Sequence, residues 1–228
     1  MKGIIPAAGK GTRLGMGCKS LTKVNGCHLI SYPLKNMKSL ELEETIIVHN
    51  GNEIKDTIGN CYEGMKISYV EQKERKGIAH AVSLTEELVN GDDICIILGD
   101  IIYTGGDLKE MKDHFYDDPK RSCLFGVKRV ELKEEIMKSY GISYNGKIIE
   151  KPRYVKRLFP LLGLGIYMAD YNFYDYINKT KTGMRGEVEI TDTLESISKD
   201  RINFHELKGF YANVNTVHEL KTARNGGM

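Results

Sequence analysis

The sequence has no excess of charge of either sign. Its 33 Lys and Arg residues are balanced by 31 Asp and Glu residues, for a formal net charge of +2. Proteins that bind nucleic acids or anionic membrane surfaces usually carry a strong positive excess, so we expect neither partner. The apolar runs are far too short to span a bilayer, and there is no internal repeat or low-complexity tract. These absences leave an ordinary globular protein.

The sequence also lacks any cysteine pattern. The cysteines are odd in number and form no Cys-x-x-Cys pair; they are Cys18, Cys27, Cys61, Cys95 and Cys123. This excludes a disulfide framework or a zinc knuckle and favours a reduced, cytoplasmic location. No signal peptide is expected, because a strand and a glycine-rich loop already occupy the first residues.

The 228 residues, 41% of them hydrophobic, can bury a sizeable core as one domain. Apolar runs predict strands at 4–5, 45–48, 66–70, 93–100, 122–130, 161–167 and 209–216. Helices are predicted at 28–40, 108–116 and 219–224, and a hairpin with an Asn-Gly turn at 140–149. Alternation of strands and helices predicts an α/β fold with a doubly wound, mostly parallel, Rossmann-like sheet.

A glycine-rich loop with two cations follows the first strand. Gly9 and Gly11 allow unusual backbone dihedral angles and close approach of a ligand, while Lys10 and Arg13 add positive charge. Free N–H groups and cations in such a loop suit a polyphosphate. The loop therefore predicts a phosphate site.

Two common phosphate loops are excluded by spacing. The dinucleotide fingerprint requires a third Gly where this chain has Leu14, and no carboxylate ends the strand at 45–48. The P-loop requires Gly before its Lys-Ser or Lys-Thr pair, whereas Cys18 precedes Lys19 here.

The loop instead resembles that of the sugar-1-phosphate nucleotidyltransferases, most closely the glucose-1-phosphate thymidylyltransferases. Those enzymes read Gly-x-x-x-Ala-Ala-Gly-x-Gly-Thr-Arg-Leu, with a Lys shortly after. The resemblance implies that Arg13 stabilises the departing β- and γ-phosphates and that Lys19 holds the α-phosphate. Cys18 stands where the family usually has Pro, and the link from Arg13 to Lys19 is shorter than usual. The implied nucleotide-binding residues of the loop are Ala7, Ala8, Gly9, Gly11, Thr12 and Arg13.

A second segment, residues 72–82, follows the strand at 66–70. It is similar to the Gln-x-x-x-x-Gly-x-Ala-x-Ala stretch of sugar-nucleotide pyrophosphorylases, which implies that Gln72 and the Gly77 backbone bind the pyrimidine base. A Gln amide carries both a donor and an acceptor, so by flipping it can match an imide edge or a cytosine edge. The identity of the base stays open.

Asp100 follows an apolar run typical of a central parallel strand. Its carboxylate is expected at the edge of the sheet where ligands bind. The Leu-Gly-Asp sequence resembles the metal-binding acid of the family, which implies Mg²⁺ as cofactor. Ile102 in the third position counts against the Asp-x-Asp pattern of related glycosyltransferases. The second ligand, an Asp in the thymidylyltransferases, is Asn213 by spacing or Asn215 by the Val-Asn pattern found elsewhere in the superfamily.

The later motifs resemble the sugar-binding half of the same family. Tyr-Gly-x-x, a hairpin and Glu-Lys-Pro imply that Gly141 and Glu150 hold sugar hydroxyls and that Lys151 places the attacking phosphate. Gly165 is expected to let the sugar phosphate approach its strand. Residues 185–192 match Arg-Gly-Glu-x-Glu-Ile-Thr-Asp, partly a wall of the sugar pocket. Within it, Thr191 or Asp192 is expected to N-cap a helix that begins near 193.

Together the resemblances span residues 2–224 and imply a single nucleotidyltransferase domain, 1–228, of the nucleotide-diphospho-sugar transferase type. The nucleotide half is expected at about 1–129 plus the C-terminal strand, and a small β-rich sugar-binding half at about 130–207. The implied partners are an NTP (dTTP, UTP or CTP) and a phosphorylated sugar, which give an NDP-sugar and pyrophosphate with Mg²⁺. No C-terminal helical extension or acyltransferase β-helix is expected, so the oligomeric state stays open.

Two other functions remain open. The first is a cytidylyltransferase for a polyol or choline phosphate, against which the sugar-side motifs argue. The second is a non-catalytic relative that senses nucleotide-sugars, against which Arg13, Lys19 and Asp100 argue.

Overall fold

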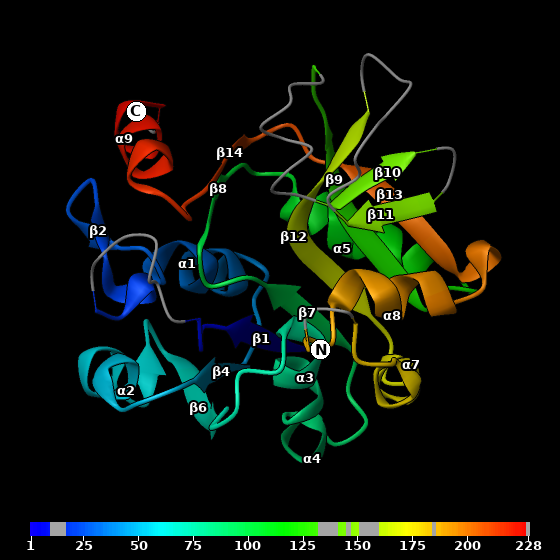
Figure 1. Cartoon of the computed structure of the whole chain (residues 1–228), viewed down its shortest axis with the longest axis horizontal. Helices are drawn as coiled ribbons and strands as arrows, with labels where there is room; N and C mark the ends of the chain where they lie inside the picture. Colours follow the sequence, from blue (N-terminus) through cyan, green and yellow to red (C-terminus); the bar gives the residue numbers. More distant parts are fainter. Residues whose placement is uncertain (10–16, 132–140, 145–146, 151–159, 184–185, 227–228) are drawn as a thin grey trace.

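The computed structural model describes residues 1–9, 17–131, 141–144, 147–150, 160–183 and 186–226 (Figure 1). Its strands are β1 (Lys2–Pro6), β2 (Lys23–Val24), β3 (Cys27–His28), β4 (Glu44–His49), β5 (Cys61–Tyr62), β6 (Met65–Glu71), β7 (Ile94–Ile97), β8 (Ile101–Thr104), β9 (Cys123–Arg129), β10 (Gly141–Tyr144), β11 (Lys147–Glu150), β12 (Leu161–Ala169), β13 (Ile202–Glu206) and β14 (Phe210–Asn213). Its helices are α1 (Ser31–Ser39), α2 (Glu53–Ile58), α3 (Ile78–Ser83), α4 (Glu86–Val89), α5 (Leu108–Asp117), α7 (Phe173–Lys179), α8 (Ile190–Ser196) and α9 (Val217–Gly226), with 3₁₀ turns η2 (Lys19–Leu21) and η3 (Lys199–Arg201).

One mixed sheet organises the chain, in the order β11-β10-β12-β7-β1-β4-β6-β5. Strands β7, β1, β4 and β6 are parallel, and β12 is antiparallel to β7. β9 pairs with β12 on one side and with β13 on the other. The expected α/β fold is confirmed, with the parallel strands in the first part of the chain.

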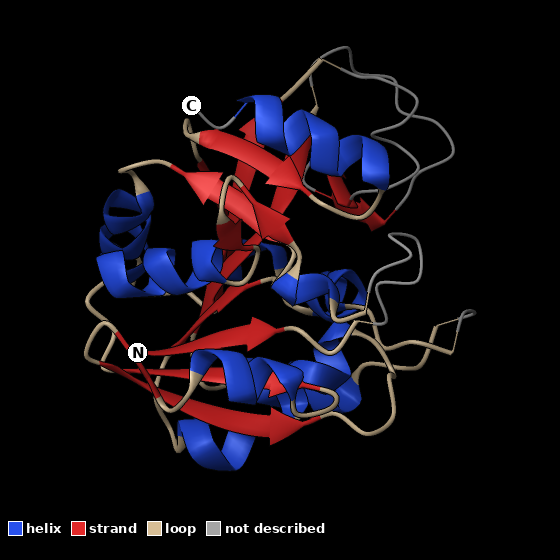
Figure 2. Ribbon diagram, turned by 90° about the vertical axis from the view of Figure 1, so that its left-hand side faces the viewer, coloured by secondary structure: helices blue, strands red, loops and turns tan. Residues whose placement is uncertain are grey.

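The sheet is covered by helices on both faces (Figure 2). Side chains alternate along each strand, so Ile4 packs with apolar residues of α3, α7 and α8, whereas Ile5 packs with those of α1 and α5. This is the doubly wound arrangement that the sequence predicted. No helix among the described residues is long and apolar enough to cross a membrane, and all five cysteines are free thiols.

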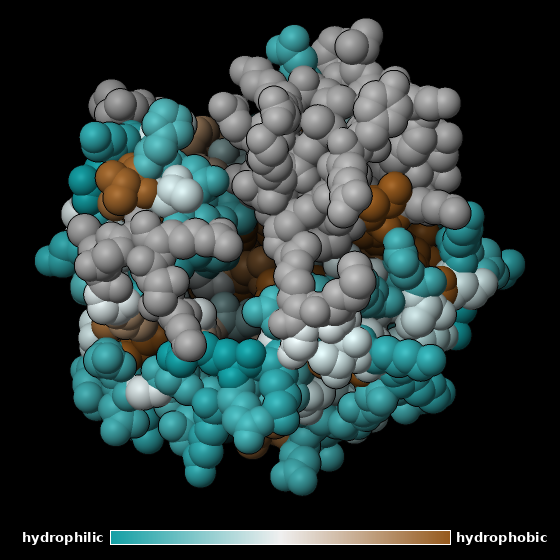
Figure 3. Space-filling view, in the orientation of Figure 1, coloured by the Kyte–Doolittle hydropathy of each residue, from teal (hydrophilic) through white to brown (hydrophobic). Residues whose placement is uncertain are grey.

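A third, smaller core joins the two ends of the chain. Val24 of β2, Ile102 of β8, Val214 after β14 and Leu220 of α9 are all buried together. Strands β8 and β14 form their own antiparallel pair, and Figure 1 shows this pair and α9 on the same side of the molecule as β2. Figure 3 shows this face of the molecule hollowed near its centre, with hydrophobic residues visible in the hollow.

Three predicted elements have other boundaries in the structure. The first helix begins at Ser31 rather than 28, because residues 27–28 pair with β2 as strand β3. The strand before Asp100 ends at Ile97, because the amide of Gly99 turns to the carbonyl of Pro6 at 3.0 Å. The last strand, predicted at 209–216, is limited to β14 (Phe210–Asn213). It pairs with β8 outside the main sheet.

The predicted helix cap at 191–192 was also wrong. Helix α8 begins at Ile190, with Glu189 at the N-cap position and no side-chain cap, so Thr191 and Asp192 lie inside the first turn. The cause is a main-chain anchor one residue earlier. The Val188 amide donates to the carbonyl of Lys76 at 2.7 Å, which fixes the chain before the helix begins.

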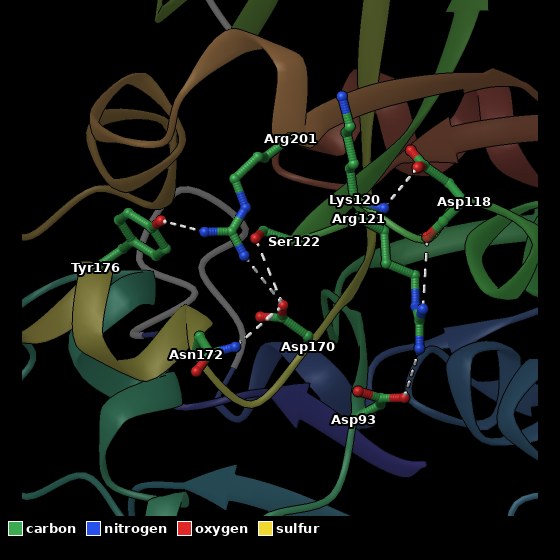
Figure 4. Close-up of polar contacts among 9 residues, drawn as sticks. All are labelled: Asp93, Asp118, Lys120, Arg121, Ser122, Asp170, Asn172, Tyr176 and Arg201. Carbon is green, nitrogen blue, oxygen red and sulfur yellow. Dashed lines mark hydrogen bonds and ion pairs between the residues drawn. The ribbon is translucent and has the colours of Figure 1, made fainter.

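A polar cluster ties the end of β12 to the start of β9 and to η3 (Figure 4). Oδ2 of Asp170 accepts from Ser122 at 3.4 Å and from Asn172 at 3.3 Å. The same oxygen lies 3.7 Å from the guanidinium of Arg201. The other oxygen, Oδ1, is buried with no partner among the described residues. Burial raises the pKa of Asp170, because desolvation of the carboxylate outweighs these donors.

Replacing Asp170 by Asn is therefore expected to raise the free energy of unfolding more at about pH 8 than at about pH 4. Folding raises the pKa of this carboxyl, so the stability it contributes is present at low pH and is lost as pH rises through the folded-state pKa. Denaturant unfolding at the two pH values measures the effect. Asp175→Asn, at an exposed position of α7, is the control. An equal effect of Asp170→Asn at both pH values would contradict the prediction.

Candidate active site

Four polar side chains from three distant parts of the chain meet at the carboxyl edge of the sheet. Nζ of Lys19 lies 2.5 Å from Oδ2 of Asp100 and donates to Oδ1 of Asn215 at 2.6 Å. Asn215 donates in turn from Nδ2 to Oδ1 of Asn213, at 2.7 Å. The side chains of Lys19 and Asp100 are only 11% and 25% exposed, so their attraction is screened less than that of a surface pair.

A short hairpin holds Lys19 in place. Lys19 opens η2, and its carbonyl accepts from the amide of Thr22 at 3.0 Å. The chain then forms β2 and β3, joined by Asn25 and Gly26 with φ of 50° and 81°. Positive φ at both central residues is what a tight two-residue hairpin requires. The Asn-Gly pair therefore shapes the hairpin that follows Lys19.

Main-chain contacts bring Asp100 and Asn215 together. Asp100 lies in the turn between β7 and β8, and its carbonyl accepts from the Val214 amide at 3.0 Å. The Asn215 amide donates to Oε2 of Glu219 at 2.8 Å, and the Glu219 amide donates to Oγ1 of Thr216 at 3.2 Å. This exchange is similar to a capping box. It fixes the start of α9 and, with it, the position of Asn215.

The donor set of this cluster suits a hard divalent cation. One carboxylate and two amide carbonyls supply oxygen ligands, the type that Mg²⁺ prefers. Within the described ranges, no group of three or more His, Cys, Asp and Glu side chains could hold a metal. A cation here would therefore need the Asn oxygens of Asn213 or Asn215, with water or substrate oxygens. Because the Lys19 ammonium now lies among these oxygens, it would have to move aside.

The described part of the glycine-rich loop packs tightly against neighbouring strand ends. Ala7 and Ala8 are 7% and 6% exposed, whereas Gly9 is exposed. The amide of Ala7 donates to the carbonyl of Val48 at 2.7 Å. A Cβ added at Gly99 would lie 3.1 Å from the Cβ of Ala7. The small residues in both turns allow the loop to lie close to the turn that carries Asp100.

Arg75 holds this loop and was not predicted as a site residue. Its Nε donates to the carbonyl of Ala8 at 2.6 Å, and its terminal nitrogen donates to Oδ1 of Asn50 at 2.7 Å. Asn50 donates in turn to the carbonyl of Gln72 at 2.7 Å. These bonds join the loops after β1, β4 and β6. Arg75 could not be singled out from the sequence, because it is one charge within a run of charged residues.

Gln72 is buried at the end of β6, 4% exposed. Its Nε2 donates to the carbonyl of Gly77 at 3.1 Å and lies 2.9 Å from Nδ1 of His80. The side chain that was predicted to bind the base is therefore held by its own neighbours. His80 was not predicted to take part in the site.

The backbone conformation and packing at position 77 require a glycine. Its φ is 99°, and a Cβ there would lie 2.5 Å from the carbonyl oxygen of Val188. Gly165 is similar, with φ of 69° at an irregularity in the pairing of β12 with β9, and a Cβ there would lie 2.8 Å from Leu98. Backbone conformation and packing thus account for both glycines, and their contacts with a ligand stay predictions.

A comparison with protein families bears on the whole site. The model of the family described as nucleotidyl transferase matches residues 2–212, a span that includes Lys19 and Asp100. The chain belongs to this nucleotidyl transferase family. The resemblance inferred from the loop and the later motifs is thereby confirmed.

Two curated relatives of this chain are named as nucleotidyltransferases of sugars or glycan biosynthesis. A low-salt glycan biosynthesis nucleotidyltransferase of Haloferax volcanii is 27% identical over 239 residues, which cover 98% of this chain and 65% of that protein. UTP–glucose-1-phosphate uridylyltransferase 1 of Staphylococcus saprophyticus is 27% identical over 249 residues, which cover 91% of this chain and 85% of the relative. The chain thus spans just under two thirds of the first relative and most of the second.

Solved structures resemble this chain over nearly its whole length. A Bacillus anthracis protein assigned as a glucose-1-phosphate thymidylyltransferase, in complex with a sucrose, has a TM-score of 0.83 and 25% identity, covering 99% of this chain and 94% of that one. A UDP-glucose pyrophosphorylase complexed with UDP-glucose has a TM-score of 0.87 at 24% identity, covering 99% and 97%. At that identity the second likeness supports the fold alone.

Several predicted site residues of this chain lie outside the described residues. They are Gly11, Thr12, Arg13 and Lys151. Gly141 and Glu150 are described only as the paired ends of β10 and β11. The structure therefore brings together Lys19, Asp100, Asn213 and Asn215, next to a loop that begins at Ala7.

Proposed function

We propose that this chain transfers a nucleoside monophosphate from an NTP to a sugar 1-phosphate. The products are an NDP-sugar and pyrophosphate. The observation that carries the proposal is the contact of Lys19 with Asp100 and Asn215, at the edge of a sheet built like those of the relatives. The names of the relatives support sugar 1-phosphates as acceptors. We place the reaction in a reduced compartment such as the cytoplasm, since all five cysteines are free thiols.

In the proposed reaction, an oxygen of the sugar phosphate attacks the α-phosphorus of the NTP. The bond from that phosphorus to the bridging oxygen breaks, and pyrophosphate leaves on the opposite side. Such transfers depend on positioning and on neutralising charge, and need no protein nucleophile. Lys19 would hold the α-phosphate, Arg13 the leaving phosphates and Lys151 the attacking phosphate. Glu150 and Gly141 would hold the sugar, with Gly165 beside it.

Asp100, with Asn213 and Asn215, would hold Mg²⁺, which when bound neutralises charge on the phosphates. Lys19 would then exchange its contact with Asp100 for one with the α-phosphate. The ion pair of the free protein thus keeps an otherwise unpaired acid and cation together, close to the place where both act. The division into a nucleotide half at about 1–129 and a sugar half at about 130–207 remains part of the proposal.

Arg75→Ala is expected to weaken NTP binding by about tenfold. Charge-assisted hydrogen bonds contribute about 1.5–3 kcal/mol, and we expect the low end because these bonds hold the loop rather than the ligand. The substitution releases the Ala8 carbonyl and Asn50. Calorimetric titration with the preferred NTP measures the effect. Lys73→Ala, at an exposed position two residues away, is the matched control. Wild-type affinity in Arg75→Ala would contradict the role given to this residue.

The test of the proposed function is pyrophosphate release from a panel of four NTPs. Each is paired with several sugar 1-phosphates, a polyol phosphate and choline phosphate. Release with a sugar 1-phosphate supports the proposal. Release only with CTP and a non-sugar phosphate would replace it with the cytidylyltransferase alternative. No release across the panel, with nucleotide-sugar binding retained, would indicate a sensor.

A further inference from the structure

The amide of Gln72 has one orientation in this structure, and its neighbours determine which. The Gly77 carbonyl can only accept a hydrogen bond, so the atom 3.1 Å from it must be the amide nitrogen. The second proton of that nitrogen points to Nδ1 of His80, at 2.9 Å. Both donors of the Gln72 amide are therefore used within the protein.

The oxygen of the same amide is left to bind something else. No hydrogen bond from a described residue reaches Oε1 of Gln72, and Oε1 is not among the fully buried, unpartnered oxygens. It therefore keeps access to solvent although the residue as a whole is 4% exposed. Gln72 follows β6 at the edge of the sheet where Ala8 and Arg75 also lie. At that edge Gln72 offers an acceptor and no donor.

His80 can maintain this orientation only as a neutral ring. To accept from Gln72, Nδ1 must lack a proton, and the ring proton must then be on Nε2. Burial, with a smaller contribution from Lys76, lowers the pKa of His80, while Glu74 opposes the shift. The neutral form therefore predominates near neutral pH. His80 is in α3, two residues after Ile78, where the helix begins.

We propose that His80 is a positioning residue that holds the Gln72 amide with Oε1 toward the nucleotide base, so that the site selects uracil or thymine over cytosine. The inference rests on the proposed function and on the contact with the base that the family resemblance implies for Gln72. Uracil and thymine carry an N3–H donor between two carbonyl acceptors, and this donor pairs with Oε1. Cytosine has an acceptor at N3, which would face Oε1 without a proton between them.

Flipping the amide would let Gln72 accommodate cytosine, but His80 and Gly77 oppose it. A flipped amide would place Oε1 against the Gly77 carbonyl, an acceptor–acceptor contact, and it would face a second one at Nδ1 of His80 unless the ring proton moved from Nε2 to Nδ1. Leaving buried polar groups unpaired in this way corresponds to about a tenfold to hundredfold loss of CTP affinity relative to UTP or dTTP. The sequence alone could not decide between the two bases, because it did not place His80 beside Gln72.

The experiment compares equilibrium binding of UTP, dTTP and CTP to the full chain and two variants, with pyrophosphate release measured in parallel. His80→Leu removes one of the two acceptors that hold the amide and leaves only the Gly77 carbonyl to oppose a flip. His80→Asp restores an oxygen that can only accept, and an acid is tolerated in the first turn of a helix. Thermal melting checks that both variants are folded.

The wild type and His80→Asp are expected to prefer UTP and dTTP by about tenfold or more. His80→Leu should lose part of this preference, mainly by binding CTP more tightly, because only the Gly77 carbonyl still opposes the flip. A preference that is undiminished in His80→Leu, or a wild type without preference, would overturn the role of His80 and leave the transfer reaction intact. An imide preference in binding, without pyrophosphate release from any NTP, would instead refute the proposed function and support the role of His80.

Discussion

Lys19→Met is expected to lower kcat by about a hundredfold to a thousandfold, the range seen when one group that stabilises developing charge is removed. Met keeps most of the length of the side chain and removes the ammonium. In the free protein this ammonium lies 2.5 Å from Asp100 and 2.6 Å from Asn215, and its side chain is 11% exposed. In the role proposed for Lys19, a charge held in so shielded a position would act on the α-phosphate with little screening by water. KM should change much less than kcat.

Lys23→Met is the matched control for this prediction. Lys23 is in β2 of the hairpin that follows Lys19, but it is exposed. Its replacement should leave kcat unchanged. Steady-state pyrophosphate release with saturating substrates measures both variants, and thermal melting shows whether the hairpin has kept its place. Wild-type turnover in Lys19→Met would show that the role given to Lys19 is wrong.

The parallel half of the fold could be predicted because its strands are continuous apolar runs. The run before Asp100 contains Ile94 to Ile97, and all four residues are fully buried. The same reasoning from apolar runs predicted a strand that continues to residue 100, three residues beyond its observed end. Periodicity does not reveal that Gly99 turns away to the Pro6 carbonyl, because that bond joins residues more than ninety positions apart.

The last strand shows a second limit. Residues 210–213 read as a strand and form one, but local pattern could not tell which partner they choose. Pairing with β8 depends on the small core of Val24, Ile102, Val214 and Leu220. That core also determines which Asn side chains reach Lys19. The sequence therefore left Asn213 and Asn215 as alternatives, whereas in the structure they are hydrogen-bonded to each other.

Arg75 and His80 show why supporting residues were missed. A charged residue in a polar loop and a His on a short helix have no distinctive spacing. Their importance comes from what they touch, the Ala8 carbonyl and the Gln72 amide. The residues expected to contact substrate were identifiable by resemblance, but the residues that hold them in place are apparent only in the folded structure.

Asp100→Asn is expected to lower turnover by about a hundredfold or more and to raise the Mg²⁺ concentration needed for half-maximal rate. Asn is nearly isosteric with Asp, so packing in the turn between β7 and β8 should be kept. Asp100 supplies the single negative charge of a donor set whose other members, Asn213 and Asn215, are neutral. A site with three amide oxygens and no carboxylate has little attraction for a cation that loses its water reluctantly.

The two Asn residues provide graded comparisons for Asp100→Asn. Asn215→Ala removes an oxygen that now contacts Lys19, and also frees Asn213. Asn213→Ala removes only the oxygen that accepts from Asn215. We therefore expect the Mg²⁺ requirement to rise most in Asp100→Asn, less in Asn215→Ala and least in Asn213→Ala. The paramagnetic signal of Mn²⁺, measured with NTP present and without turnover, gives the metal affinity of each variant. These affinities test whether metal binding follows the same order as the Mg²⁺ requirement. An Asp100→Asn variant with wild-type Mn²⁺ affinity would remove Asp100 from the metal site, whatever its effect on the rate.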